Sequence, residues 1–327
     1  MKEERRQRAA KLVEPMKMEV VLTTTASPGP GEVRVRLEGC GVCASNLPVW
    51  EGRPWFQYPV AAGSPGHEGW GVVDAVGEGV EDLEPGERVA LLSGNAYAEY
   101  DVAPREAVVR LPRELSGWPF PGEPLGCAMN ILERSDLRPG HSVAIVGAGF
   151  LGVLLTQLAV KAGAHVVVIS RRKFALVQAE KMGAVCALQS DDEAATRERA
   201  LKLTEGRGYD RVIEAAGLQS TLDLASALAA EYGRLVIAGY HQDGLRQVNM
   251  QQWNWRALDV VNAHERSMAR YVSGMQRAVD AVLHGRMDPF PLLTHQVTLD
   301  SLDEGFKLTR ARPDGFMKAF VRIGGWT

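Results

Sequence analysis

The stretch Gly147-Ala148-Gly149-Phe150-Leu151-Gly152 decides the fold, because of what precedes and follows it. Residues 142–146 before it are rich in β-branched side chains and predict a buried strand. Residues 153–162 after it predict a helix, and residues 166–169 predict a second strand. The glycines therefore fall at the turn of a strand–turn–helix–strand unit, which is the setting in which G-x-G-x-x-G is specific.

Each glycine of this turn has a physical task in dinucleotide binding. Gly147 permits a tight turn, Gly149 lets the backbone approach a pyrophosphate, and Gly152 lets the helix pack close to the strand. Phe150 and Leu151 open the helix, whose free N–H groups and positive dipole end favour phosphate. We expect these five residues to contact a dinucleotide.

The second half of the chain keeps alternating strands and helices, which predicts an α/β fold with a doubly wound parallel sheet of the Rossmann kind. Ala215 and Gly239 lie at the ends of two predicted strands and are further candidates for cofactor contact. Ser220 is the expected N-cap of one helix. The predicted strands cover residues 212–217, 235–239 and 259–263, and the predicted helices cover residues 175–182, 220–230 and 268–283.

The first half has a different character. From about residue 20 to residue 111, short runs of alternating apolar and polar residues are interrupted by many glycines and prolines. This pattern is typical of a compact β-rich domain with tight turns. The tail, residues 292–323, returns to short mixed elements.

Bulk properties exclude several function classes. With 327 residues the chain predicts roughly two domains, and a net charge of −3 without a basic arm argues against nucleic-acid binding. The charged segment 1–11 is no secretory signal, and like Glu14 and Asp259 we interpret it as solvated surface. No run reaches the ~18 apolar residues of a membrane span. We expect a cytoplasmic, reduced protein, since four cysteines in this length make no disulfide framework: Cys40, Cys43, Cys127 and Cys186.

Three places in the β-rich half and at its end carry metal-ligand chemistry. Cys43 lies in one polar cluster, His67 and Glu68 lie in a second, and Glu123 lies near the boundary of the two halves. Cysteine, histidine and a carboxylate are the ligand types of a catalytic zinc with one open position. From the residues alone, Cys40 and Cys43 are also compatible with a zinc knuckle or a redox pair.

Several motifs in order resemble the medium-chain dehydrogenase/reductase superfamily, in its zinc-dependent alcohol and polyol dehydrogenase branch. The resemblance runs nearly from end to end and is most specific over residues 66–80. Further matching stretches are residues 28–33, 39–46, 85–89 and 97–100. The resemblance implies a GroES-like catalytic domain over residues 1–123, a cofactor-binding domain over 124–264, and a return to the catalytic domain over 265–327.

The resemblance also implies roles for the candidate ligands. Cys43 and His67 would be zinc ligands, Glu68 an exchangeable or outer ligand, and Glu123 the third ligand, with Cys127 in the core. Residues 90–95 run directly into residue 97, where some family members insert four cysteines, so we expect one catalytic zinc and no structural zinc.

Two positions depart from the family pattern. Asn46 stands where the family usually has an aspartate that orients the histidine ligand, and it can still accept a hydrogen bond. Pro48 stands where the family often has a proton-shuttling histidine. Proline carries no proton, so Ser45 and water would have to exchange the proton of the substrate oxygen. The other interpretation of Ser45 is a turn hydroxyl bonded to its own backbone.

The end of the second strand of the cofactor half predicts which dinucleotide binds. An acidic residue there would hydrogen-bond the ribose 2′-hydroxyl of NAD. This chain instead has Ser170, Arg171, Arg172 and Lys173, which offer donors to a 2′-phosphate. NADP(H) is therefore the favoured cofactor, and NAD(H) remains an alternative, as does a merely solvated basic turn.

The chain is thus predicted to be an oxidoreductase that transfers a hydride between NADP(H) and a small alcohol or carbonyl compound, with zinc as Lewis acid. The compound would be a secondary alcohol, a polyol or a ketone, and the resemblance implies a homodimer or homotetramer. The alternatives are a zinc-free enone or quinone reductase of the same superfamily and a non-catalytic cofactor-binding protein.

Aromatic and histidine residues leave further alternatives open. Trp50, Trp55, Phe56 and Tyr58 either border the substrate cleft or pack a loop onto the β-rich domain. Trp253 and Trp255 would shape a dimer surface or the pocket, and the isolated His241 and His264 are interpreted as structural residues rather than ligands.

Overall fold

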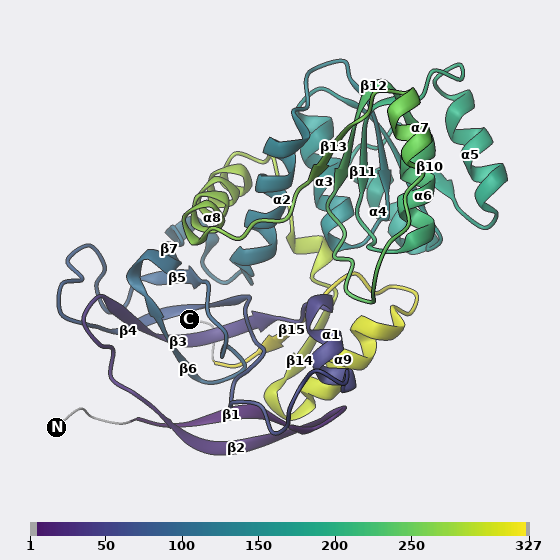
Figure 1. Cartoon of the computed structure of the whole chain (residues 1–327). Coiled ribbons are helices and arrows are strands. Elements are labelled where there is room, and N and C mark those ends of the chain that lie inside the picture. Colours follow the sequence, from purple (N-terminus) through teal and green to yellow (C-terminus); the bar gives the residue numbers. More distant parts are fainter. Residues whose placement is uncertain (1–4, 325–327) are drawn as a thin grey trace. The chain divides into compact units, whose positions relative to one another are not determined.

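The computed structural model describes residues 5–324; residues 1–4 and 325–327, which begin and end the expected catalytic domain, lie outside them. The chain forms two compact units (Figure 1). Unit 1 comprises the residues up to Gly126, Ser267–Leu283 and the residues from Pro289 onward. Unit 2 comprises Cys127–Arg266 and His284–Asp288.

Unit 2 contains a six-stranded parallel sheet in the order β10-β9-β8-β11-β12-β13. The chain starts at the centre, moves to one edge and then returns to build the other, which is the predicted doubly wound arrangement. The strands are β8 (Ser142–Val146), β9 (His165–Ser170), β10 (Cys186–Gln189), β11 (Tyr209–Glu214), β12 (Ala229–Ile237) and β13 (Asp259–Asn262).

Helices cover both faces of this sheet (Figure 1). Helix α3 packs on α4, whereas α5 packs on α6. Both faces are therefore shielded from solvent, which is why the central strands carry apolar side chains on both faces. The helices are α3 (Phe150–Lys161), α4 (Lys173–Lys181), α5 (Glu193–Lys202), α6 (Gln219–Leu228) and α7 (Met250–Trp255).

Unit 1 is built on a seven-stranded, mostly antiparallel sheet in the order β14-β15-β3-β4-β5-β7, with β6 paired to β3. The strands are β3 (Glu32–Gly41), β4 (Gly69–Val76), β5 (Arg88–Leu91), β6 (Tyr100–Pro104), β7 (Val108–Arg110), β14 (His295–Thr298) and β15 (Ala319–Arg322). The helices are α1 (Leu47–Glu51), α8 (Met268–Leu283) and α9 (Leu302–Ala311), and α2 (Gly122–Ser135) begins in this unit.

The N-terminal segment corrects one prediction. Residues interpreted as charged surface form β1 (Arg5–Glu14), which pairs with β2 (Lys17–Thr25). Ala9, Ala10 and Leu12 are fully buried on β1, because the strand also hydrogen-bonds the segment near Tyr97 on its other side. Its arginines, Arg5, Arg6 and Arg8, are exposed and precede these apolar residues, so the high charge concealed the strand.

A second correction concerns α6 and the strand after it. The helix starts at Gln219 and not after Ser220, because the backbone N–H of Leu218 donates to Thr221 Oγ1 at 3.2 Å and so fixes the first turn. It ends at Leu228, and β12 begins at the next residue instead of at 235. Within residues 5–324, every helix is too short or too polar to cross a lipid bilayer.

Candidate functional site

Three strands of unit 1 bring the polar candidates to one corner of its sheet. The antiparallel pairing of β3 with β4 and of β15 with β3 places the residues after β3 beside those before β4 and before β15. Cys43 follows β3, His67 and Glu68 precede β4, and Lys318 precedes β15. Residues far apart in the sequence therefore share one site because of strand register.

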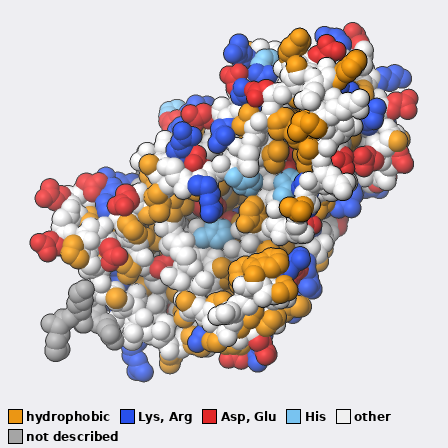
Figure 2. All heavy atoms as spheres, in the orientation of Figure 1, with side chains coloured by type: hydrophobic (Ala, Val, Ile, Leu, Met, Phe, Trp, Pro, Cys, Tyr) orange, Lys and Arg blue, Asp and Glu red, His pale blue; other side chains and the backbone are white. Residues whose placement is uncertain are grey.

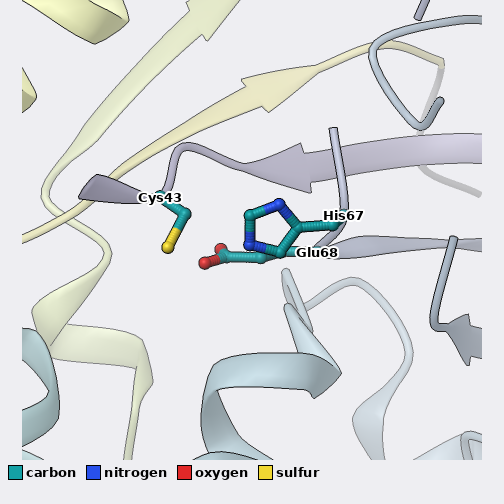
Figure 3. A group of neighbouring side chains, drawn as sticks. All are labelled: Cys43, His67 and Glu68. Atoms are coloured by element: carbon teal, nitrogen blue, oxygen red, sulfur yellow. The ribbon is translucent and has the colours of Figure 1, made fainter. Parts of the chain in front are cut away.

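Cys43, His67 and Glu68 form a compact donor cluster. One ligand atom from each, a sulfur, a ring nitrogen and a carboxylate oxygen, lies within 4.8 Å of the others. Figure 3 shows the three side chains converging on a common point. Sulfur, nitrogen and carboxylate oxygen are the donor atoms that zinc takes in proteins, so the chemistry of this cluster fits a zinc ion.

The histidine is oriented by a backbone carbonyl. His67 Nδ1 lies 3.1 Å from the Pro65 carbonyl oxygen, which can only accept, so Nδ1 carries the proton and Nε2 is left to bind a metal. Asn46 was expected to accept a hydrogen bond that orients this ring. Instead its Nδ2 donates to the same Pro65 oxygen at 2.9 Å, so it supports the carbonyl.

The electrostatics of the corner favour a cation. Burial alone would lower the pKa of His67, but a hydrogen bond to Cys43 and the negative charges of Cys43, Glu123 and Glu68 raise it to about 10. Burial would also lower the pKa of Lys318, yet the charges of Glu68 and Cys43 raise it. The site therefore attracts positive charge, which is the second reason that a divalent metal fits.

Lys318 is a site residue that the sequence analysis missed. Its Nζ lies 2.9 Å and 2.7 Å from the two carboxylate oxygens of Glu68. Gly41 makes room for this pair, since a Cβ there would lie 1.7 Å from Glu68 Oε2. A single lysine near the end of the sequence does not by itself predict a site residue. The one available signal was its position directly before the apolar strand β15.

Glu123 and the other cysteines occupy different positions. Glu123 lies in the first turn of α2, and its charge acts on both His67 and Lys318, but it is outside the compact group found among residues 5–324. Cys40 is completely buried, and burial raises the pKa of its thiol well above the usual value. Cys127 is partly buried.

The residues beside Cys43 differ in what they can do. Ser45 does not bond its own backbone but donates from Oγ to Cys43 Sγ at 3.1 Å. Pro48 is buried in the first turn of α1. The hydroxyl that the sequence predicts to exchange a proton therefore donates to the Cys43 sulfur.

The aromatic residues separate into packed and exposed ones. Trp50 is fully buried, stacks on Phe306 with ring centroids 5.4 Å apart, and donates from Nε1 to Asp303 at 2.8 Å. Its packing role is therefore clear, whereas Trp55 is exposed. In unit 2, Trp253 packs against the core and Trp255 is exposed.

The glycine turn in unit 2 has the geometry that its sequence predicts. Gly147 has a φ of +112°, and Gly149 is the N-cap of α3, so Phe150 and Leu151 begin the helix. A Cβ at Gly152 would lie 1.9 Å from the Gly147 carbonyl oxygen, so only glycine allows this close approach.

The remaining cofactor candidates line the same carboxyl edge of the parallel sheet. Ser170 ends β9, and its Oγ accepts from the Arg172 N–H at 3.3 Å, while the Arg172 guanidinium donates to the Ala148 carbonyl at 3.3 Å. Ala215 follows β11 and Gly239 follows β12. This edge is where doubly wound sheets bind dinucleotides.

Comparison with known families agrees with this geometry. The family described as "Alcohol dehydrogenase GroES-like domain" matches residues 29–113, and "Zinc-binding dehydrogenase" matches residues 151–284. The chain belongs to the zinc-dependent alcohol and polyol dehydrogenase branch of the medium-chain dehydrogenase/reductase superfamily. It is therefore an oxidoreductase of the alcohol dehydrogenase type.

Individual relatives differ in substrate. L-threonine 3-dehydrogenase of Pyrococcus abyssi is 27% identical, over 91% of this chain and 93% of that protein. Galactitol 1-phosphate 5-dehydrogenase of Escherichia coli K12 is 32% identical, over 65% of this chain and 69% of that protein. A solved alcohol dehydrogenase from Escherichia coli CFT073 complexed with NADH superposes with a TM-score of 0.86 at 22% identity, over 97% of this chain and 99% of that one.

Proposed function

We propose that this protein is a zinc-dependent oxidoreductase that transfers a hydride between NADP(H) and a small secondary alcohol, polyol or ketone. The convergence of Cys43, His67 and Glu68 carries the proposal, because it supplies zinc donors in a chain of the zinc-dependent family. The related threonine and galactitol 1-phosphate dehydrogenases support an alcohol as substrate.

Cys43, His67 and Glu123 would hold the metal. Glu68 is already paired with Lys318, which suits an exchangeable ligand rather than a permanent one. When bound, zinc supplies the Lewis acidity that polarises an alcohol or carbonyl oxygen. The Ser45 hydroxyl, beside Cys43, would exchange the proton of that oxygen with water, a role that Pro48 cannot share.

The glycine turn would hold the pyrophosphate at the N-terminus of α3. The fold itself accepts NADH in a related structure, so the preference for NADP(H) rests on residues 170–173. No carboxylate is present there to accept from a ribose 2′-hydroxyl, and Arg171 and Arg172 offer donors to a 2′-phosphate.

Activity measurements after metal removal test this function. The protein is assayed with NADP⁺ against secondary alcohols and polyols, including L-threonine and galactitol 1-phosphate. Dialysis against a chelator should abolish turnover, zinc should restore it, and Cys43→Ala should prevent the restoration. Full turnover after chelation would instead indicate a zinc-free reductase, and dinucleotide binding without turnover would indicate a cofactor-binding protein.

We also propose that the protein assembles as a homodimer or homotetramer through β13. This strand lies at one end of the parallel sheet, where an edge can pair with the same edge of a second copy. Light scattering at micromolar concentration should give the mass of a dimer or tetramer; a monomer would exclude this assembly.

A further inference from the structure

A buried carboxylate in unit 2 takes no part in the function proposed above. Glu214 ends β11, and its side chain is 0% exposed. Its Oε1 accepts from the N–H groups of Ala216 and Gly217 at 2.9 and 2.8 Å. The Thr221 hydroxyl donates to the same oxygen at 2.6 Å. Oε2 lies 3.1 Å from Nε2 of His241, so the histidine completes the carboxylate's partners.

The proton arrangement of this histidine follows from its other neighbour. Arg246 Nε lies 2.7 Å from His241 Nδ1. Because an arginine N–H can only donate, Nδ1 must accept, and Nε2 must carry the proton that it donates to Glu214. A neutral imidazole therefore links a guanidinium to a buried carboxylate. We call Glu214, His241 and Arg246 the latch.

The latch ties down the loop of residues 240–249, which joins β12 to α7. The guanidinium of Arg246 also donates to the Gly217 carbonyl at 2.9 Å. Gln219 and Gln247 exchange two hydrogen bonds, with the Gln219 amide donating at 2.8 Å and accepting at 3.0 Å. The loop is thus attached to the turn after β11 and to the start of α6.

The loop lies at the carboxyl edge of the sheet, beside the cofactor candidates. A Cβ at Gly239 would lie 2.3 Å from the Gly217 nitrogen and 2.4 Å from Glu214 Oε2, so the turns after β11 and β12 touch. A doubly wound sheet is built of two mononucleotide-binding halves. The glycine turn belongs to the half formed by β8 to β10, so a dinucleotide bound there would place its nicotinamide mononucleotide on the half formed by β11 to β13.

We propose that His241 and Arg246 are positioning residues for the nicotinamide half of the cofactor. They act through the loop 240–249, which the latch holds at the edge where that half binds. The inference rests on the proposed function, since it requires a bound nicotinamide dinucleotide. It gives His241, interpreted from the sequence as structural, a specific effect on one end of the ligand.

Calorimetric titration with two ligands tests the inference. NADPH spans both halves of the site, whereas adenosine 2′,5′-bisphosphate occupies only the adenosine half. NADH and AMP form the corresponding pair if NAD(H) is preferred. His241→Leu should weaken dinucleotide binding about tenfold or more and leave the adenosine ligand within about twofold. His241→Gln, whose amide can both donate and accept, should recover much of the loss.

Matched controls make the result decisive. His165→Gln changes an exposed histidine at the opposite edge of the same sheet and should alter neither affinity. Arg246→Leu removes the hydrogen bond from the loop to His241. It should have the same effect on the two ligands, and it provides the test if His241→Leu does not fold. If His241→Leu weakens the binding of both ligands equally, or of neither, the inference is wrong but the proposed function still stands. A wild-type protein that binds no dinucleotide would overturn the proposed function as well.

Discussion

The ammonium of Lys318 and the carboxylate of Glu68 form an ion pair inside unit 1, with Nζ 2.7 Å from Oε2 and side chains only 7% and 0% exposed. Lys318 also donates to the Val42 carbonyl at 3.3 Å. The two charges are thus shielded from solvent and neutralise each other, at the corner that holds Cys43 and His67. Removing one charge therefore leaves the other buried without its direct counter-charge.

Lys318→Met should lower the free energy of unfolding by about 3–5 kcal/mol, because the Glu68 carboxylate loses its counter-charge. Urea denaturation measures this loss. Lys307→Met is the matched control, because Lys307 is exposed and its ion pair with Glu304 is long, at 3.9 Å. This variant should lower the free energy of unfolding by less than about 0.5 kcal/mol. Adding Glu68→Gln to Lys318→Met should recover stability; a double variant no more stable than the single one would contradict the pair.

Gly41→Ala should destabilise unit 1, because its new Cβ would collide with Glu68 Oε2. We expect a loss of about 1–3 kcal/mol by urea denaturation, with a lower zinc content as the carboxylate shifts. Gly94→Ala in the same unit meets nothing within 4 Å and should be nearly neutral. Equal stability of the two variants would contradict this prediction, because it would show that Glu68 moves away from the new Cβ at little cost in free energy.

Arg171→Ala should raise the KM for NADPH more than the KM for NADH, because only NADPH carries the 2′-phosphate. Charge-assisted bonds of this kind contribute about 1.5–3 kcal/mol, which predicts at least a tenfold shift in the ratio. Steady-state kinetics with both cofactors measures it. Lys181→Ala, in the last turn of α4, is a control for loss of positive charge. A wild-type preference for NADH would refute the assignment.

Zinc affinity should rise with pH. In the metal-free protein the pKa of His67 is about 10, above its ordinary value of 6.5, so the ring must release its proton to bind metal. Below that pKa, each pH unit should strengthen apparent zinc binding about tenfold or more. Competition with a chromophoric chelator between pH 6.5 and 8.5, corrected for the chelator's own titration, measures the slope. A flat profile would mean that His67 is not a ligand.

The sequence predicts much of unit 2, because its apolar runs are long and sharply bounded. Residues 142–146 form β8 as predicted, and in unit 1 residues 268–283 form α8 as predicted. Helix α5 was not foreseen, since only Thr196 and Ala200 are buried along its length and no apolar stripe marks it. Strand β1 was concealed by the exposed Arg5, Arg6 and Arg8, and the burial of its apolar residues depends on pairing partners that a local pattern does not reveal.

The site divides in the same way. Cys43 and His67 lie in recognisable motifs, so local sequence locates them. Lys318 is 250 residues from Glu68, and only the register of β15 against β3 brings them together. Asn46 was expected to contact His67, but a carbonyl oxygen took that position. Long-range partners of this kind have no local signature.

The most direct test of the account is the metal content of the protein purified with zinc and without chelator. Mass spectrometry of the metal should find about one zinc per chain. Cys43→Ala, His67→Ala and Glu123→Ala should each lose it, whereas Cys127→Ala should retain it. Zinc-free wild-type protein, or Cys43→Ala with undiminished zinc, would contradict the proposed metal centre.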